Sequence, residues 1–218
     1  MSFLQYLING ISIGSVYAII ALGYTMVYGI ARMLNFAHGD VIMVGAYMSY
    51  CVTSYLGLPP AVGVLAAVIV CTLLGVLIEG LAYKPLRGVP SLAVLITAIG
   101  MSYLLQNLAY YVTGGVPKQY PELPWISDTI TILGASTKRV TVITPILTLA
   151  LVVALVILIK RTKVGMAMRA ASKDFETAQL MGIKINSVIS FTFIIGSALA
   201  AVASFLYFSN YTTIAPAS

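Results

Sequence analysis

Long apolar runs alternate with short polar breaks along the chain, and the runs have the length of membrane helices. A helix crosses the hydrocarbon core of a bilayer with about 20 mostly apolar residues. Six runs reach or approach that length, at residues 8–30, 41–56, 61–82, 91–112, 140–159 and 188–208. Because the runs are continuous rather than alternating, they exclude a membrane β-barrel. The pattern predicts an all-α, polytopic bundle of about six transmembrane helices, of which the second is short.

The polar breaks are uneven, and one of them carries much of the charge. Gly57-Leu58-Pro59-Pro60 predicts a turn, and residues 114–139 predict a long irregular loop. The interval 160–187 holds eight of the 18 charged residues: Lys160, Arg161, Lys163, Arg169, Lys173, Asp174, Glu176 and Lys184. This interval is therefore expected to lie in water beside the membrane.

Composition agrees with a membrane protein and excludes other classes. The chain is 60% hydrophobic and 8% charged, whereas soluble domains carry about a quarter charged residues. The net charge of +6 does not indicate nucleic-acid binding, because no polar domain is present to carry a basic face. Cys51 and Cys71 lie within apolar runs without clustered ligands, so we expect no metal site and no catalytic constellation.

Basic residues predict the orientation. Counted on alternate loops, one side holds nine, namely Arg32, Lys84, Arg87, Lys160, Arg161, Lys163, Arg169, Lys173 and Lys184; the other holds three, namely Lys118, Lys138 and Arg139. Lysine and arginine concentrate on the cytoplasmic side of membrane proteins. The N-terminus and the 114–139 loop are therefore expected outside the cell.

Small residues recur four apart in three of the runs. Such rows let neighbouring helices approach closely, so these helices are expected to face protein. The rows are Gly10, Gly14 and Ala18; Gly63, Ala67, Cys71 and Gly75; and Gly196, Ala200 and Ser204.

Polar residues inside and after the first run are candidates for a transport pathway. Asn9 and Ser15 either line a pathway or form hydrogen bonds between helices. After the run, Asn35, His38 and Asp40 interrupt the apolar pattern. One interpretation is a turn in which Asp40 caps the second helix; the other is a discontinuous helix that dips toward the pathway. His38 is expected to be structural.

Glu79 lies near the end of the third run. An acid at that depth needs a partner, so we expect it to pair with Lys84 or Arg87, with a proton relay as the alternative.

The charged interval contains a short helix signal. Ser172 is predicted to cap a helix of about nine residues that ends at Gly182. Phe175, Ala178 and either Leu180 or Met181 give it an apolar side, which either docks in a partner's groove or packs against the chain's own spans. The chain has no phosphate-binding loop of the Gly-x-x-x-x-Gly-Lys-Ser/Thr type. Active transport would therefore need another subunit to supply energy.

Three stretches resemble one family. The first is Gly10 to Gly23 followed by Leu34-Asn35-Phe36-Ala37-His38-Gly39-Asp40 and Gly45-Ala46-Tyr47. The second runs from Gly165 to Asp174 and on to Glu176-Thr177-Ala178 and Leu180-Met181-Gly182-Ile183, and the third from Phe193 to Ala201. Together they resemble the permeases of branched-chain amino-acid ABC importers of the LivH type, over nearly the whole chain.

The resemblance implies a complex and a coupling surface. It implies a second, homologous permease subunit, two cytoplasmic ABC ATPase subunits that bind the ATP, an extracytoplasmic substrate-binding protein, and a prokaryotic inner or plasma membrane. It assigns ATPase coupling to Glu176, Ala178, Gly182 and Arg169. Thr177 replaces an alanine of the general importer pattern Glu-Ala-Ala-x-x-x-Gly, and Thr192, Ile194 and Ile195 stand where its Ile-x-Leu-Pro part would be.

The resemblance also implies one transmembrane domain over residues 1–218, without the C-terminal spans that longer relatives have. Within the family, urea, amides or other amino acids remain alternative substrates. Outside it, a secondary transporter or channel working alone, or a membrane scaffold, remain alternative functions.

Overall fold

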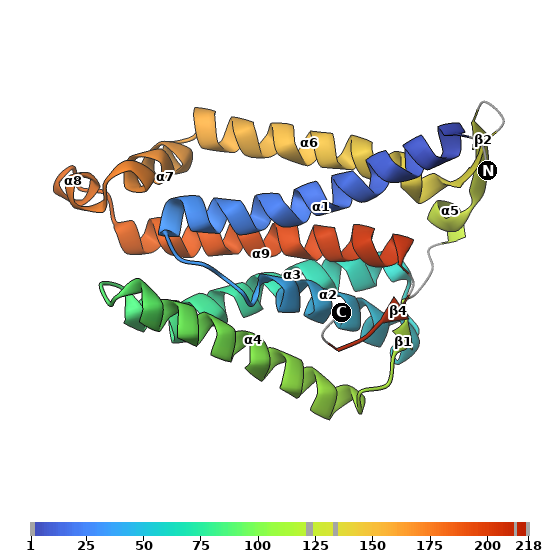
Figure 1. The fold of residues 1–218 in the computed structure, drawn as a ribbon, viewed down its shortest axis with the longest axis horizontal. Helices are drawn as coiled ribbons and strands as arrows, with labels where there is room; N and C mark the ends of the chain where they lie inside the picture. Colours follow the sequence, from blue (N-terminus) through green and yellow to red (C-terminus); the bar gives the residue numbers. More distant parts are fainter. Residues whose placement is uncertain (1–2, 121–123, 133–134, 212, 217–218) are drawn as a thin grey trace.

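Six long helices run roughly along one axis in the computed structural model, which describes residues 3–120, 124–132, 135–211 and 213–216 (Figure 1). They are α1 (Phe3–Ala31), α2 (His38–Ser54), α3 (Pro60–Ile78), α4 (Ser91–Thr113), α6 (Arg139–Arg161) and α9 (Ile185–Asn210). The polytopic all-α architecture is thereby confirmed.

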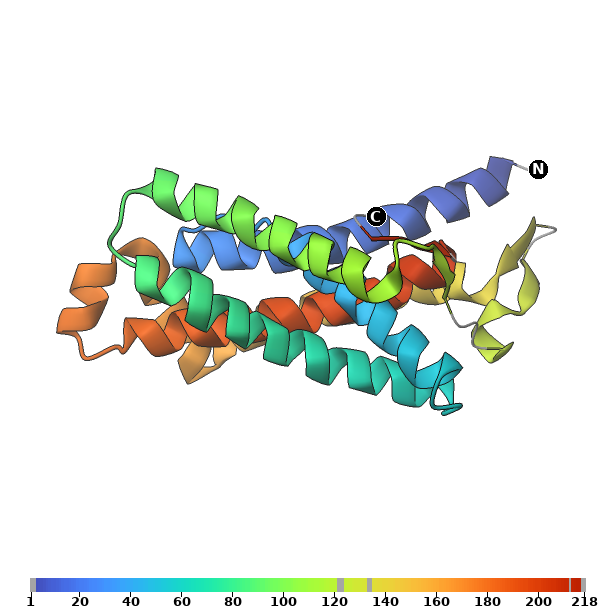
Figure 2. The same cartoon turned by 90° about the horizontal axis from the view of Figure 1, so that it is seen from below.

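Helix α9 forms the centre of the bundle. It packs against α1, α2 and α3, and α6 lies on the far side of α1 (Figure 1). Its buried face combines Phe193 with small residues such as Ala200 and Ala203, so that neighbouring helices approach closely. α4 forms one edge of the bundle and buries few residues, among them Ala98 (Figure 2).

Five of the predicted spans are helices long and apolar enough to cross a membrane. The predicted span 41–56 corresponds to α2, which has 17 residues and is shorter than the usual span. The third span continues past α3 as a π-helix, η1 (Glu79–Tyr83), and a 3₁₀ turn, η2 (Lys84–Leu86). Pro85 lies in that turn and Pro90 precedes α4, so prolines end one passage and start the next.

The bundle has two different ends (Figure 1). At one end, here called the α7–α8 end, lie α7 (Lys163–Lys173) and α8 (Phe175–Leu180). At the other, here called the hairpin end, lie α5 (Pro124–Ser127) and two antiparallel pairs: β2 (Thr129–Ile132) with β3 (Ala135–Lys138), and β1 (Lys118–Gln119) with β4 (Thr213–Ile214). The nine basic residues counted on one side lie at the α7–α8 end, and the other three lie at the hairpin end.

The charged interval folds differently from its prediction. It contains two helices, and Ser172 lies inside α7 instead of capping a helix. Thr162 caps α7 by accepting from the Gly165 N–H at 3.0 Å, and Asp174 caps α8 by accepting from the Glu176 N–H at 3.0 Å. Asp174, rather than Ser172, is the cap because its backbone is extended. This conformation lets the carboxylate reach the free N–H donors in the first turn of α8.

The small-residue rows of the third and sixth runs do pack as predicted. A Cβ on Gly75 would collide with the Ser197 side chain, and one on Gly196 would lie 2.9 Å from Val27 Cγ2. Gly63 likewise meets the backbone of α2, because its Cβ would lie 3.1 Å from the Ser49 carbonyl oxygen.

Gly10 and Gly14 do not share this role. Both are exposed, and a Cβ built on either would meet nothing within 4 Å among the described residues. Within the described residues no other helix packs on these two positions, so helix packing at Gly10 and Gly14 stays a prediction. The reason is rotational: α1 turns its Ser12 and Val16 side toward the bundle, and the Gly10 row lies on another face.

Candidate functional site

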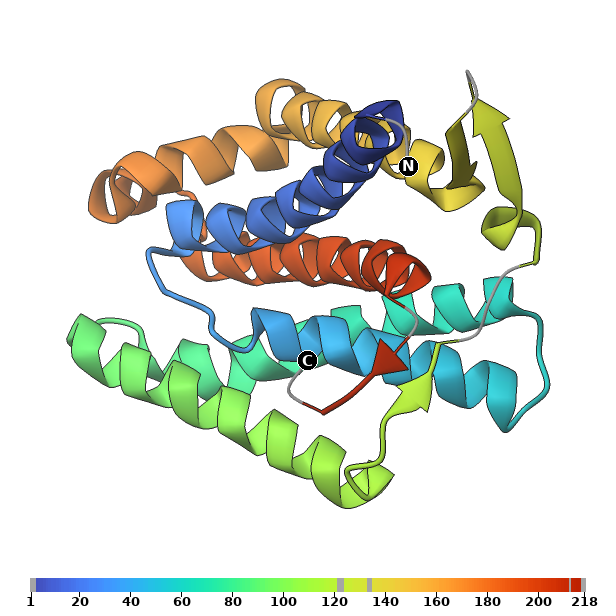
Figure 3. The ribbon, with the colours of Figure 1, turned by 45° about the vertical axis from the view of Figure 1, so that its right-hand side comes forward.

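The break between α1 and α2 lies inside the bundle. Residues 32–37 contain no helix, and they run back from the α7–α8 end so that α2 begins partway along α9 (Figures 1 and 3). Asn35 and Ala37 of this stretch are buried. Irregular backbone at membrane depth is stable only where protein encloses it. The structure therefore has a buried break between two helices, as a discontinuous helix requires, and its facing a pathway stays a prediction.

Tyr83 of η1 holds the break in place. Its Oη lies 3.2 Å from the Leu34 carbonyl oxygen and 3.1 Å from Asn35 Oδ1, so one hydroxyl bridges a half-buried carbonyl and a buried amide. The tyrosine itself is fully buried. π-Helical turns occur frequently at functional sites. Here the π-helical turn places the Tyr83 hydroxyl against the non-helical stretch between α1 and α2, where the Leu34 carbonyl accepts its hydrogen bond.

His38 and Asp40 lie together with Asn35, in the first turn of α2. The His38 N–H donates to the Asn35 carbonyl oxygen at 3.2 Å, and its ring packs on α1 where a Cβ on Gly23 would lie 2.8 Å from Cε1. The sequence predicted a structural histidine, and this tight packing is consistent with that role.

The prediction that Asp40 caps α2 is wrong. The helix begins at His38 without a side-chain cap, so Asp40 is already inside the first turn. Its Oδ1 instead accepts from Gln106 Nε2 of α4 at 3.0 Å. In hydrocarbon such a bond lacks competition from water, so it fixes α4 against α2.

The other two pathway candidates, Asn9 and Ser15, lie on α1, away from the break. Ser15 Oγ donates to the Ile11 carbonyl oxygen at 2.7 Å, and Thr148 Oγ1 of α6 donates to the Ser15 carbonyl at 3.4 Å. Ser15 thus serves helix contacts. Asn9 lines a hollow at the hairpin end. The structure brings Asn35, His38 and Asp40 together and leaves Asn9 and Ser15 apart from them.

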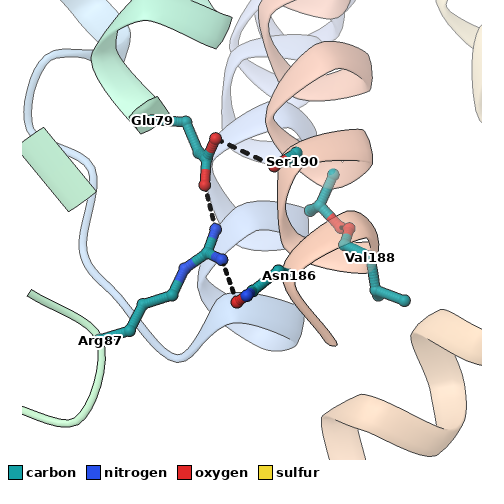
Figure 4. A network of polar contacts seen from close by, with 6 residues as sticks. Glu79, Arg87, Asn186, Val188 and Ser190 are labelled. Carbon is teal, nitrogen blue, oxygen red and sulfur yellow. Dashed lines mark hydrogen bonds and ion pairs between the residues drawn. The ribbon is translucent and has the colours of Figure 1, made fainter. Parts of the chain in front are cut away.

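Glu79 forms an ion pair with Arg87, one of the two predicted partners (Figure 4). Arg87 also donates to Asn186 Oδ1, and Ser190 Oγ donates to the second Glu79 oxygen at 3.0 Å. The network joins η1 and the loop after η2 to the first turns of α9. Because each carboxylate oxygen has a donor, the buried acid is compensated without a proton relay.

Arg32 joins the end of α1 to the charged interval, a contact that sequence reasoning missed. Its Nη2 donates to the carbonyl oxygens of Ser172 at 3.0 Å and Lys173 at 2.7 Å, which are among the last carbonyls of α7. Its guanidinium carbon lies 5.2 Å from the centre of the Phe175 ring. These are the favoured contacts of a cation at a helix C-terminus and over an aromatic face.

The backbone of Arg32 is unusual, since its φ of 56° lies in the left-handed region. That conformation stops α1 and turns the chain inward, so the position costs free energy that its contacts must offset. The only signal available from sequence was a single cation directly after the first apolar run.

Helix α8 presents a small exposed surface. Leu180 and Met181 are 87% and 79% exposed, and Glu176 is exposed beside them. Ala178 is buried against the bundle, and Phe175 lies under Arg32. The prediction that these apolar residues form one side is therefore wrong. They divide between an inner face that holds the helix and an outer face that is exposed.

Gly182 ends α8 as predicted. Its φ of 82° favours glycine, its N–H donates to the Gln179 carbonyl at 2.9 Å, and the Ile183 N–H donates to the Ala178 carbonyl at 3.1 Å. This pair of bonds is the Schellman motif. At the other end of α8, a hydrogen bond from Thr177 holds the pKa of the Asp174 carboxyl below its usual value. Asp174 is therefore a charged cap at neutral pH.

Arg169 does not join this surface. It lies exposed on α7, where it lines a hollow of about 300 Å³ between α1, α6 and α7.

Comparison with known proteins gives one family. The model of that family, described as "Branched-chain amino acid transport system / permease component", matches residues 6–218. LivH, a high-affinity branched-chain amino acid transport system permease protein of Salmonella typhimurium, is 40% identical over 98% of this chain and 73% of its own length. LivH of Escherichia coli K12 matches equally, and BraD of Pseudomonas aeruginosa is 38% identical over the same shares. No solved structure matches significantly. The chain therefore belongs to the family of permease components of branched-chain amino-acid transport systems and is a multi-pass protein of the cell membrane.

Proposed function

We propose that the chain is the permease subunit of an ATP-driven importer that moves branched-chain or similar hydrophobic amino acids. The printed function of the LivH and BraD relatives supports this substrate class. The expected assembly contains a second, homologous permease, two cytoplasmic ATPases that bind the ATP, and an extracytoplasmic binding protein. The chain's own task is conduction, without a cofactor of its own.

In this proposal the α7–α8 end faces the cytoplasm. The excess of lysine and arginine at that end supports the orientation. The N-terminus and the β2–β3 hairpin then face the binding protein outside.

The ATPases dock on the outer face of α8. The observation that carries this step is the combination of Leu180 and Met181, which are apolar and almost fully exposed, with Glu176 on a helix whose other face is fixed by Ala178. Exposed apolar residues on a surface helix are the kind of anchor that docks in a partner's groove. Gly182 fixes where the helix ends, whereas Arg169, to which the resemblance also assigned coupling, lies on α7 apart from this face.

Two connections carry the motion of α8 into the membrane. Arg32 ties the α7–α8 junction to α1 and to the buried break that follows it. The Glu79–Arg87–Asn186 network ties the start of α9 to η1, and Tyr83 of η1 holds the same break. Both routes converge on the region of Asn35, His38 and Asp40, which we propose as the gate.

Reconstitution tests the proposal. Proteoliposomes that contain the chain, a second permease and the ATPases, with binding protein supplied on the hairpin side, should move L-leucine to the α7–α8 side only when ATP is supplied there. Urea, acetamide and L-glutamate serve as competing substrates, and preference for one of these would replace the amino-acid class. Leucine uptake that persists without ATPase subunits would contradict the proposal.

A further inference from the structure

A polar hollow lies at the hairpin end, apart from the gate region. It has a volume of about 340 Å³, near the lower end of the roughly 300–1,000 Å³ of small-molecule sites. Its walls come from the start of α1, the end of β3, the start of α6 and the end of α9, which adjoin at this end of the bundle (Figure 3). The polar lining includes Asn9, Ser12, Thr137, Lys138, Thr141 and Asn210.

Ser12 gives the first sign that the hollow takes a ligand. Its side chain is 1% exposed, and its Oγ has no hydrogen-bond partner among the described residues. A buried hydroxyl without a partner costs about 1–3 kcal/mol. Elsewhere on α1, Ser15 and Thr25 bond to carbonyls of the preceding turn, whereas Ser12 lines the hollow instead.

The charge of the hollow favours an anionic group. Lys138 is the cation in its lining, and none of the described lining residues is acidic. Lys138 immediately precedes α6, and Thr141 is the third residue of that helix, so the positive end of the helix dipole lies at the hollow. α6 also begins without a side-chain cap.

The other lining residues suit the ammonium group and the hydrophobic side chain of an amino acid. Asn210 donates through Nδ2 to the Leu206 carbonyl at 2.8 Å, which leaves its Oδ1 as the acceptor for an ammonium group. Ile13 and Tyr211 add apolar wall for a hydrophobic side chain.

We propose that this hollow is an outer subsite that receives an α-amino acid, with its carboxylate held by Lys138, the start of α6 and Ser12. The inference rests on the proposed function for its substrate and its direction. In that frame, the amino acid released by the binding protein is held here before it reaches the gate.

Direct binding tests the subsite on the full chain in lipid nanodiscs. The probes are L-leucine and leucinol, which lacks the carboxylate. Wild-type protein should bind leucine about tenfold more tightly than leucinol, and Lys138→Gln should remove that difference by weakening leucine alone. Lys118→Gln, a lysine of β1 at the same end but outside the lining, is the matched control and should bind both as wild type does.

Ser12→Ala gives a second readout that a structural role would not produce. It should weaken leucine binding roughly three- to tenfold, while its thermal midpoint stays equal or rises, since the lost hydroxyl had no partner. The subsite is overturned if wild type shows no leucine binding up to about 10 mM, or if Lys138→Gln binds leucine as wild type does or weakens both probes equally.

The proposed function fails separately. ATP-dependent leucine uptake that is unchanged in Lys138→Gln would remove the subsite and leave the importer role standing. If leucine binding depends on Lys138 but the wild-type complex shows no ATP-dependent uptake, the subsite stands and the importer role fails.

Discussion

Arg32 Nη2 donates to the carbonyl oxygen of Lys173 at 2.7 Å, although the two residues are 141 positions apart in the chain. The bond places the last residue of α7 on the turn that ends α1. In the proposed coupling, this side chain transmits movement of α8 to α1, and it also covers the Phe175 ring.

Arg32→Met should separate ATP hydrolysis from transport. The variant keeps the length of the side chain but loses the donors, so α8 moves without pulling α1. We expect leucine uptake per ATP hydrolysed to fall by roughly three- to tenfold, in line with the loss of a charged hydrogen bond at a partly screened site. Lys163→Met, which removes an exposed charge at the start of α7, is the control. An unchanged ratio in Arg32→Met would show that α1 is driven by another contact.

Glu176→Lys should weaken association with the ATPases and leave membrane insertion intact. The residue is exposed on α8, and within the described part of the chain its carboxylate has no hydrogen bond or ion pair, so the fold does not depend on its charge. Co-purification of the ATPases should fall by about tenfold or more, as for a charge at a docking surface. Asp128→Lys makes the same charge change at the hairpin end and should have no effect. Equal recovery of ATPase with both variants would argue against docking on α8.

Arg87→Met should destabilise the bundle more than the double change with Glu79→Gln. Removal of one partner leaves a buried carboxylate uncompensated, at a cost of roughly 3–5 kcal/mol. Neutralising the acid as well should restore much of that loss. Thermal unfolding in detergent measures both. If the double variant is no more stable than Arg87→Met, the ion pair is not the source of the stability.

Gly75→Ala and Gly10→Ala should have opposite effects on the isolated chain. The added methyl at position 75 meets the Ser197 side chain, so overpacking should cost about 1–3 kcal/mol. At position 10 nothing lies within 4 Å in the described structure, and alanine should stabilise the helix by about 0.5–1 kcal/mol. Thermal midpoints of the two variants compare them directly. A loss of stability in Gly10→Ala would mean that this face is packed after all.

The contrast between Gly75 and Gly10 also shows what the sequence could predict. Both belong to rows spaced four apart, and that spacing identifies residues on one helix face. It does not say which face meets a neighbour, because the rotation of a helix is fixed by all the residues that pack around it. The spans themselves were predictable, since their lengths and apolar runs are properties of each segment alone.

The candidate site divides in the same way. The pairing of Glu79 with a cation could be predicted, because a buried acid requires one and the chain offers Lys84 and Arg87 within eight positions; the choice of Arg87 could not. The contact of Arg32 with α7, and of Tyr83 with the break, joins distant segments and leaves no local pattern. The Ser172 cap was wrong because two good caps, Ser172 and Asp174, compete within three residues, and only the backbone conformation decides between them.

The break after α1 also bears on how the short helix α2 can belong to a segment long enough to span a bilayer. At about 26 Å, α2 alone is too short to cross the roughly 30 Å hydrocarbon core. Residues 32–37 between α1 and α2 form no helix, and non-helical backbone can reach further per residue than a helix, which rises about 1.5 Å per residue. Residues 32–54 together therefore have enough contour to pass from one face of a bilayer to the other. The non-helical part of this segment is the one that begins at Arg32 and that Tyr83 holds by its hydroxyl.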